Sequence, residues 1–178
     1  MNIMMDTVLT HIISIGLFVL LVAAGIDKIK HRQEFVQTLG GYRLLPAGLV
    51  PVASVAIPMT EIVLAQVLVW LQAKLVVVAV AALLALYAGA IFINIRRGNL
   101  SLDCGCQFGE ARQSISMALV YRNLVLAGAT LLLLLPTMDR QFGVYDYGAM
   151  VFGLLVCTLF YVTVNRLIAN ATTYREIL

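Results

Sequence analysis

The chain has 178 residues, of which 62% are hydrophobic and only 12% are charged, whereas charged residues make up about a quarter of an ordinary soluble domain. This composition excludes a soluble enzyme and predicts an all-α integral membrane protein with a single domain. Each crossing needs about 20 apolar residues, so there is room for about five transmembrane helices. The net charge of +3 comes from basic residues that lie between apolar runs. Lys and Arg at such positions commonly set the orientation of membrane spans, so we do not interpret them as a nucleic-acid binding site.

Uncharged apolar runs predict the positions of the spans. In chain order they cover residues 7–26, 47–72, 75–95, 115–136 and 147–165. Basic residues follow the first run and do not precede it, so we interpret it as a permanent span and not as a cleaved signal sequence. Pro51 and Pro58 predict a kink in the second span, because each removes a backbone donor. The segment "LQAK" at 71–74 is expected to turn the chain tightly into the third span.

The segment between the first two spans, residues 27–46, interleaves basic and apolar side chains. Its basic members are Lys28, Lys30, Arg32 and Arg43. This pattern is typical of a short helix lying in the membrane interface, which the "GG" pair and the following proline would end. An ordinary basic loop is the alternative, with equal weight.

Two charged residues lie inside the predicted spans, Glu61 in the second and Arg122 in the fourth. A charge at the bilayer centre costs at least about 2.5 kcal/mol, so each needs a neutralising neighbour. One interpretation is a structural ion pair between them. The other is a small polar cavity near the loop after the third span, acting as a proton relay or as hydrogen-bond partners for a quinone. Asn94 and Asn123 would extend such a network or join helices, and Cys157 is predicted to be a buried small hydrophobe.

The loop at 96–114 contains the stretch "LDCGCQFGE", in which one glycine separates Cys104 from Cys106. Two thiols at this spacing can close a small strained disulfide, and strained, exposed disulfides are the oxidising ones. The "SIS" that follows is expected to cap the fourth span, and its helix N-terminus together with Arg112 would stabilise a thiolate. Asp103 opposes this effect at Cys104, so the thiol of Cys106 is expected to have the lower pKa.

Two other interpretations of the cysteine pair remain open. The thiols could be unreactive, although a chain with three cysteines rarely places two side by side by chance. A Cys-X-Cys pair can also present two thiolates to a soft metal such as Cu(I) or Hg(II), which would indicate a metal-binding or transport protein.

Four stretches of the chain carry a family resemblance: "LFVLLVAAGIDKIKHRQEFVQTLGGYRLLP", "IPMTEIVLAQVLV", "DCGCQFG" and "SISMALVYRNLVLAGATLLLL". Together they resemble the MauE proteins of methylamine utilisation, a branch of the DoxX-like membrane proteins, over most of residues 14–135. The resemblance implies a role in maturation of methylamine dehydrogenase, whose small subunit is rich in disulfides, with a thioredoxin-like partner, MauD. The architecture is also similar to DsbB and vitamin K epoxide reductase, which pass electrons between thiols and a quinone.

These observations lead to the hypothesis of a membrane thiol-disulfide oxidoreductase. Cys104 and Cys106 would cycle between dithiol and disulfide by exchange with the thioredoxin-like partner, and the first four spans would form the redox bundle. A quinone is the expected acceptor if the protein acts as an oxidase, with a site near Glu61 and Arg122, while electron flow in the reducing direction stays open. The alternative is the soft-metal protein.

Two arguments conflict over the sidedness of the cysteine loop. Nine of the twelve Lys and Arg residues lie in segments 27–46, 96–114 and 166–178, which share one side of the membrane, against two on the other side. The positive-inside rule places that side in the cytoplasm. Oxidation of exported proteins, however, makes physical sense chiefly outside the reducing cytosol. We therefore predict the bacterial inner membrane, with Cys104 and Cys106 on the periplasmic face.

Overall fold

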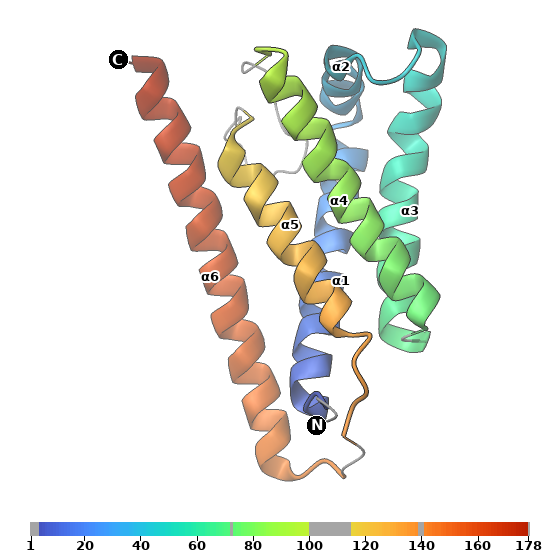
Figure 1. Ribbon diagram of the computed structural model, residues 1–178, viewed down its shortest axis with the longest axis vertical. Helices are drawn as coiled ribbons and strands as arrows, with labels where there is room; N and C mark the ends of the chain where they lie inside the picture. The colour runs from blue at the N-terminus through green and yellow to red at the C-terminus, as the bar shows by residue number, and fades with distance from the viewer. Residues whose placement is uncertain (1–3, 72, 100–114, 139–140, 178) are drawn as a thin grey trace.

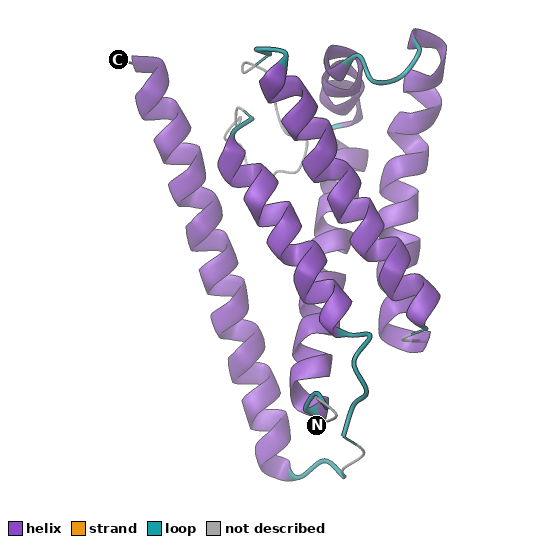
Figure 2. Cartoon of the chain, in the orientation of Figure 1, coloured by secondary structure: helices purple, strands orange, loops and turns teal. Residues whose placement is uncertain are grey.

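The computed structural model describes residues 4–71, 73–99, 115–138 and 141–177, with side chains to residue 171. These residues form helices and connecting loops, with one isolated bridge between Met5 and Thr137; Figure 2 shows the helical content. In chain order the helices are α1 (Thr7–Lys30), α2 (Arg32–Tyr42), the 3-10 turn η1 (Ala47–Leu49), α3 (Val50–Leu71), α4 (Lys74–Arg96), α5 (Met117–Leu132) and α6 (Val144–Ile177). The predicted all-α membrane helix bundle is confirmed.

Four of these helices are long and apolar enough to cross a membrane, so the protein is a multi-pass membrane protein. They are α1, η1 with α3, α4, and the Val144–Ala171 part of α6. Helix α5 has 16 residues and rises roughly 24 Å at about 1.5 Å per residue, less than the hydrocarbon thickness of about 30 Å. A fifth crossing by α5 therefore stays a prediction.

The segment after α1 is helical, which selects one of the two alternatives left open by the sequence. Helix α2 continues through the glycine pair and ends at Tyr42, because Arg43 adopts a left-handed conformation with φ of 49°. In Figure 1, α2 lies across one end of the bundle, beside the start of α3 and the end of α4. Its location in the membrane interface remains a prediction.

The buried positions of α1 and α3 alternate in steps of three and four residues. In α1 they include Ser14, Leu17, Leu21, Ala24 and Lys28, and in α3 they include Ser54, Pro58, Glu61, Ala65 and Leu68. This spacing places one face of each helix against its neighbour, as in left-handed bundles. Helix α1 accordingly packs mainly on α3, and α4 mainly on α5.

A glycine lets α1 and α3 approach closely near the C-terminal end of α1. A Cβ atom on Gly25 would lie 2.8 Å from Ile62 Cγ1 and 3.1 Å from the carbonyl oxygen of Pro58. Pro58 is inside α3, whereas Pro51 occupies the first turn, where a missing N–H is tolerated. The close approach fixes the depth of the α3 residues relative to the end of α1.

Helix α6 lies at the edge of the bundle (Figure 1) and packs mainly against α1. None of its residues between 144 and 171 is buried. Cys157 is exposed, so its prediction as a buried small hydrophobe is wrong. The reason is that an apolar side chain is as stable against lipid as against protein, so hydropathy does not distinguish the two environments.

Candidate functional site

A buried ion pair joins α1 to α3 inside the bundle. The Lys28 ammonium donates to both carboxylate oxygens of Glu61, with Nζ to Oε1 at 2.6 Å and Nζ to Oε2 at 2.9 Å. Tyr87, from α4, donates its hydroxyl to the same Oε1 at 2.6 Å. Side chains from three helices, α1, α3 and α4, therefore meet at one carboxylate.

The pair is almost fully removed from solvent, with the side chains of Lys28 and Glu61 exposed by 2% and 1%. The Lys28 ammonium also lies 5.8 Å from the ring centroid of Phe35 and 5.2 Å from that of Tyr87, within the range of cation-π attraction. Good geometry and added hydrogen bonds are what a buried ion pair needs to offset the desolvation of both charges. We refer to Lys28, Glu61 and Tyr87 as the Glu61 cluster.

Local sequence explains how Lys28 reaches this position. It lies in the last turn of α1 and continues the buried face of that helix, four residues after Ala24. A lysine near a helix end would ordinarily extend its ammonium towards water, but α2 follows immediately and places Phe35 beside it. The side chain instead turns inward to Glu61, which is fully buried.

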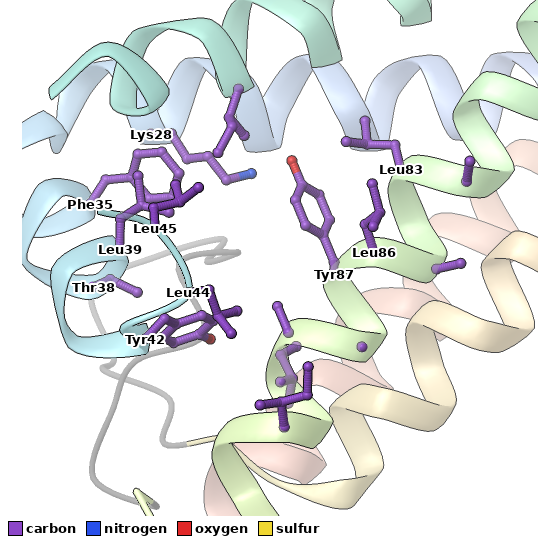
Figure 3. Close-up of a pocket in the computed structure, with 17 residues that line it drawn as sticks. Lys28, Phe35, Thr38, Leu39, Tyr42, Leu44, Leu45, Leu83, Leu86 and Tyr87 are labelled. Carbon is purple, nitrogen blue, oxygen red and sulfur yellow. The ribbon is translucent and has the colours of Figure 1, made fainter. Parts of the chain in front are cut away.

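Beside the Glu61 cluster is a cavity of about 740 Å³ between α2, α3 and α4. Figure 3 shows side chains of α2 on one side, side chains of α4 on the other, and the Lys28 ammonium and Tyr87 hydroxyl pointing toward one another at one end. Most other lining side chains are apolar, and Glu61 is not part of the lining. The volume is in the range of small-molecule sites, about 300 to 1,000 Å³.

The salt bridge of Glu61 is with Lys28, whereas the sequence suggested Arg122 as its partner. The Arg122 guanidinium donates to Asn165 Oδ1 at 2.7 Å and lies 5.8 Å from the ring centroid of Tyr161, both on α6. Arg122 also lies outside the lining of the cavity. Glu61 thus bonds to α1 and α4, whereas Arg122 bonds to α6.

Asn94 and Asn123 are buried, and each donates to a carbonyl of its own helix. The Asn94 side chain bonds Ala90 O at 3.0 Å, and the Asn123 side chain bonds Leu119 O at 3.0 Å. Asn94 also accepts from Asn99 at 3.4 Å, near the end of α4. These hydrogen bonds join each amide to its own helix or to Asn99, and none of them reaches Glu61.

Cys104, Cys106 and Arg112 lie outside the described residues. The helices that flank them are described: α4 ends at Arg96 and α5 begins at Met117, both at the end of the bundle where α2 lies (Figure 1). Ser116 occupies the N-cap position of α5, but its side chain makes no capping hydrogen bond. Among the described residues, no group of three or more His, Cys, Asp or Glu side chains is placed to hold a metal ion.

Sequence reasoning found Glu61 but missed its partners. Lys28 was assigned to the basic segment after the first span, and Tyr87 was not singled out. The signal for Lys28 was its helical spacing from the buried apolar positions of α1. The span was predicted as an uninterrupted uncharged run, which ends at the first charged residue and therefore excludes Lys28. For Tyr87 the signal was weaker, since a tyrosine in an apolar helix is common.

Comparison with known proteins identifies relatives for most of the chain. A family model described as "Methylamine utilisation protein MauE" matches residues 6–136, a range that ends before α6. The chain is 34% identical over 139 residues to the methylamine utilization protein MauE of Methylorubrum extorquens, covering 76% of this chain and 75% of that protein. It is 38% identical over 118 residues to that of Paracoccus denitrificans, covering 66% of this chain and 63% of the relative. No solved structure matches.

Proposed function

The chain belongs to the MauE family, and from this premise we propose that it is a membrane thiol-disulfide redox protein supporting disulfide formation in exported proteins such as methylamine dehydrogenase. The observation that carries the proposal is the pair Cys104 and Cys106, separated by one glycine in the segment that joins α4 to α5. A glycine between the two residues absorbs the backbone strain of a small ring. A strained disulfide is a strong oxidant, which suits transfer of a disulfide to another protein.

The exchange proceeds through a mixed disulfide with a thioredoxin-like, MauD-like partner. A thiolate of the reduced partner attacks one sulfur of the Cys104–Cys106 disulfide, so that bond breaks and an intermolecular bond forms. The partner's second thiol then displaces the chain's cysteine. The partner leaves oxidised, and Cys104 and Cys106 are left as thiols whose two electrons must pass to an acceptor before the next cycle.

The cysteine variants test this proposal. Cys104→Ser and Cys106→Ser are each expected to abolish exchange, because one sulfur cannot close the intramolecular disulfide. The measurement is the rate at which the reconstituted, oxidised full chain oxidises a reduced thioredoxin-fold protein, followed by maleimide labelling and gel mobility. When the reduced variants are mixed with an oxidised partner, the one that keeps the cysteine that exchanges with the partner should accumulate a mixed disulfide. Its thiolate attacks the partner disulfide, one partner thiol leaves, and the second cysteine that would complete the exchange is missing.

Cys157→Ala is the matched control, because this exposed cysteine of α6 is outside the proposed pair. It should leave exchange largely intact. Exchange that survives both serine variants, or that is lost only with Cys157, contradicts the proposal. A full equivalent of copper in protein purified under reducing conditions, absent from the double serine variant, would favour the soft-metal alternative.

We also propose that the protein lies in the bacterial inner membrane with its cysteine pair on the periplasmic face. The charge argument against this is weakened at Lys28, whose charge is neutralised by Glu61 inside the bundle. We expect a membrane-impermeant maleimide to label Cys104 and Cys106 in intact, reduced cells of a Cys157→Ala background. Labelling that requires cell lysis would place the pair in the cytoplasm, as the positive-inside rule predicts.

A further inference from the structure

We propose that the cavity between α2, α3 and α4 binds a lipid-soluble quinone, with its head group at Lys28 and Tyr87 and its isoprenoid tail towards the lipid. The role of this quinone as acceptor of electrons from Cys104 and Cys106 rests on the proposed function. Its binding in the cavity does not, and can be measured separately.

The lining favours a flat, conjugated ring. Three aromatic side chains, Phe35, Tyr42 and Tyr87, contribute to the cavity, the first two from α2 and the third from α4. In Figure 3 the ring of Tyr87 faces the space between the helices, with Phe35 and Tyr42 on the opposite side. Aromatic side chains pack well against planar rings in offset or edge-to-face geometry.

The polar end of the cavity favours an uncharged head group that carries oxygen atoms. Lys28 is the one charged side chain in the described lining, and its charge is balanced by Glu61 through two short hydrogen bonds. A neutral cluster gives little attraction for a phosphate, which needs unbalanced positive charge. The Tyr87 hydroxyl donates its proton to Glu61, but its oxygen can still accept a hydrogen bond from a quinol hydroxyl, and the Lys28 ammonium beside it suits the carbonyl oxygen of a quinone.

The rim of the cavity favours entry from the bilayer. Leu86 on α4 is 69% exposed, and Leu44, Leu45 and Ile93 are also exposed apolar residues. In a membrane these side chains contact lipid tails, so a hydrophobic ligand can enter between α2 and α4 without crossing water. The small side chains of α4 at Ala82, Ala85 and Gly89 leave space along the cavity for a tail.

A quinone also completes the electron balance of the proposed reaction. Oxidation of the Cys104–Cys106 dithiol breaks two S–H bonds and forms one S–S bond, releasing two electrons and two protons. Reduction of a quinone to a quinol takes up two electrons and two protons at its two oxygens. The protons have to reach the head group within the membrane, and Lys28 and Tyr87 are the proton-bearing side chains at that end of the cavity.

Gly89→Leu is the variant that tests occupancy of the cavity. A Cβ atom on Gly89 meets no other atom within 4 Å, so a larger side chain can extend into the cavity without a clash with the helices. The probe is a photoreactive azido-ubiquinone with a short tail, added to the full chain in nanodiscs. Labelled peptides should come from α2 and α4, and unlabelled short-chain quinone should compete. Gly89→Leu should weaken labelling about tenfold or more, equal to about 1.4 kcal/mol or more of binding free energy.

Gly128→Leu is the matched control, because this exposed glycine of α5 also has no neighbour within 4 Å and is outside the cavity lining. Its labelling should equal that of the unsubstituted chain. Equal labelling of Gly89→Leu and Gly128→Leu, or labelling that unlabelled quinone does not reduce, overturns the inference and indicates lipid acyl chains in the cavity. Quinone binding is also measured in the Cys104→Ser/Cys106→Ser variant, where no thiol exchange is possible. If this variant binds quinone but the unsubstituted chain shows no thiol exchange, the proposed function is wrong and the quinone site stands.

Discussion

Glu61→Leu alone is expected to lower the free energy of unfolding by about 3 to 5 kcal/mol, because it leaves the Lys28 ammonium buried without its counter-charge. Lys28→Met should have a similar effect on the carboxylate, which then retains Tyr87 as a donor. The double variant Lys28→Met/Glu61→Leu should lose much less than the sum, since no charge is left to desolvate. The measurement is unfolding in mixed detergent micelles with increasing SDS, followed by circular dichroism.

Lys30→Met is the matched control for this cycle, because the same substitution two residues later removes an exposed lysine. Its effect should stay within about 0.5 kcal/mol. Additive losses in the double variant would show that the two charges do not depend on one another. They would also remove the reason to treat the Glu61 cluster as the neutral end of the cavity.

The need for a partner at Glu61 could be predicted from the sequence, but the identity of that partner could not. A carboxylate in the middle of an apolar helix requires neutralisation wherever it packs. Which cation supplies it depends on the neighbours of α3, and these are α1, α2 and α4 in the main. Arg122 lies on α5, which packs chiefly on α4, so two charges inside predicted spans need not be partners.

The approximate positions of the long apolar helices follow from hydropathy, while their ends and their burial do not. Helix α6 extends from Val144 to Ile177, well beyond the predicted 147–165, because the polar residues after 165 continue the helix. Cys157 shows the same limit for burial. Membrane helices bury small and polar residues against one another and leave apolar ones to the lipid, so the buried Ser14, Ser54 and Thr130 mark the core better than Cys157 does.

Gly25→Ala is expected to destabilise the bundle by about 1 to 3 kcal/mol, as overpacking of a tight contact does. The added methyl group would lie 3.1 Å from the Pro58 carbonyl oxygen, which belongs to the α3 backbone and cannot rotate away. Relief requires α1 and α3 to separate, which lengthens the hydrogen bonds between Lys28 and Glu61 one turn further along.

Gly16→Ala on the same helix is the matched control. No atom lies within 4 Å of a Cβ at Gly16, so the change should be neutral or stabilising by up to about 1 kcal/mol through helix propensity. The SDS unfolding measurement decides the matter: equal effects of the two alanines would mean that α1 and α3 do not need this close approach to hold the ion pair.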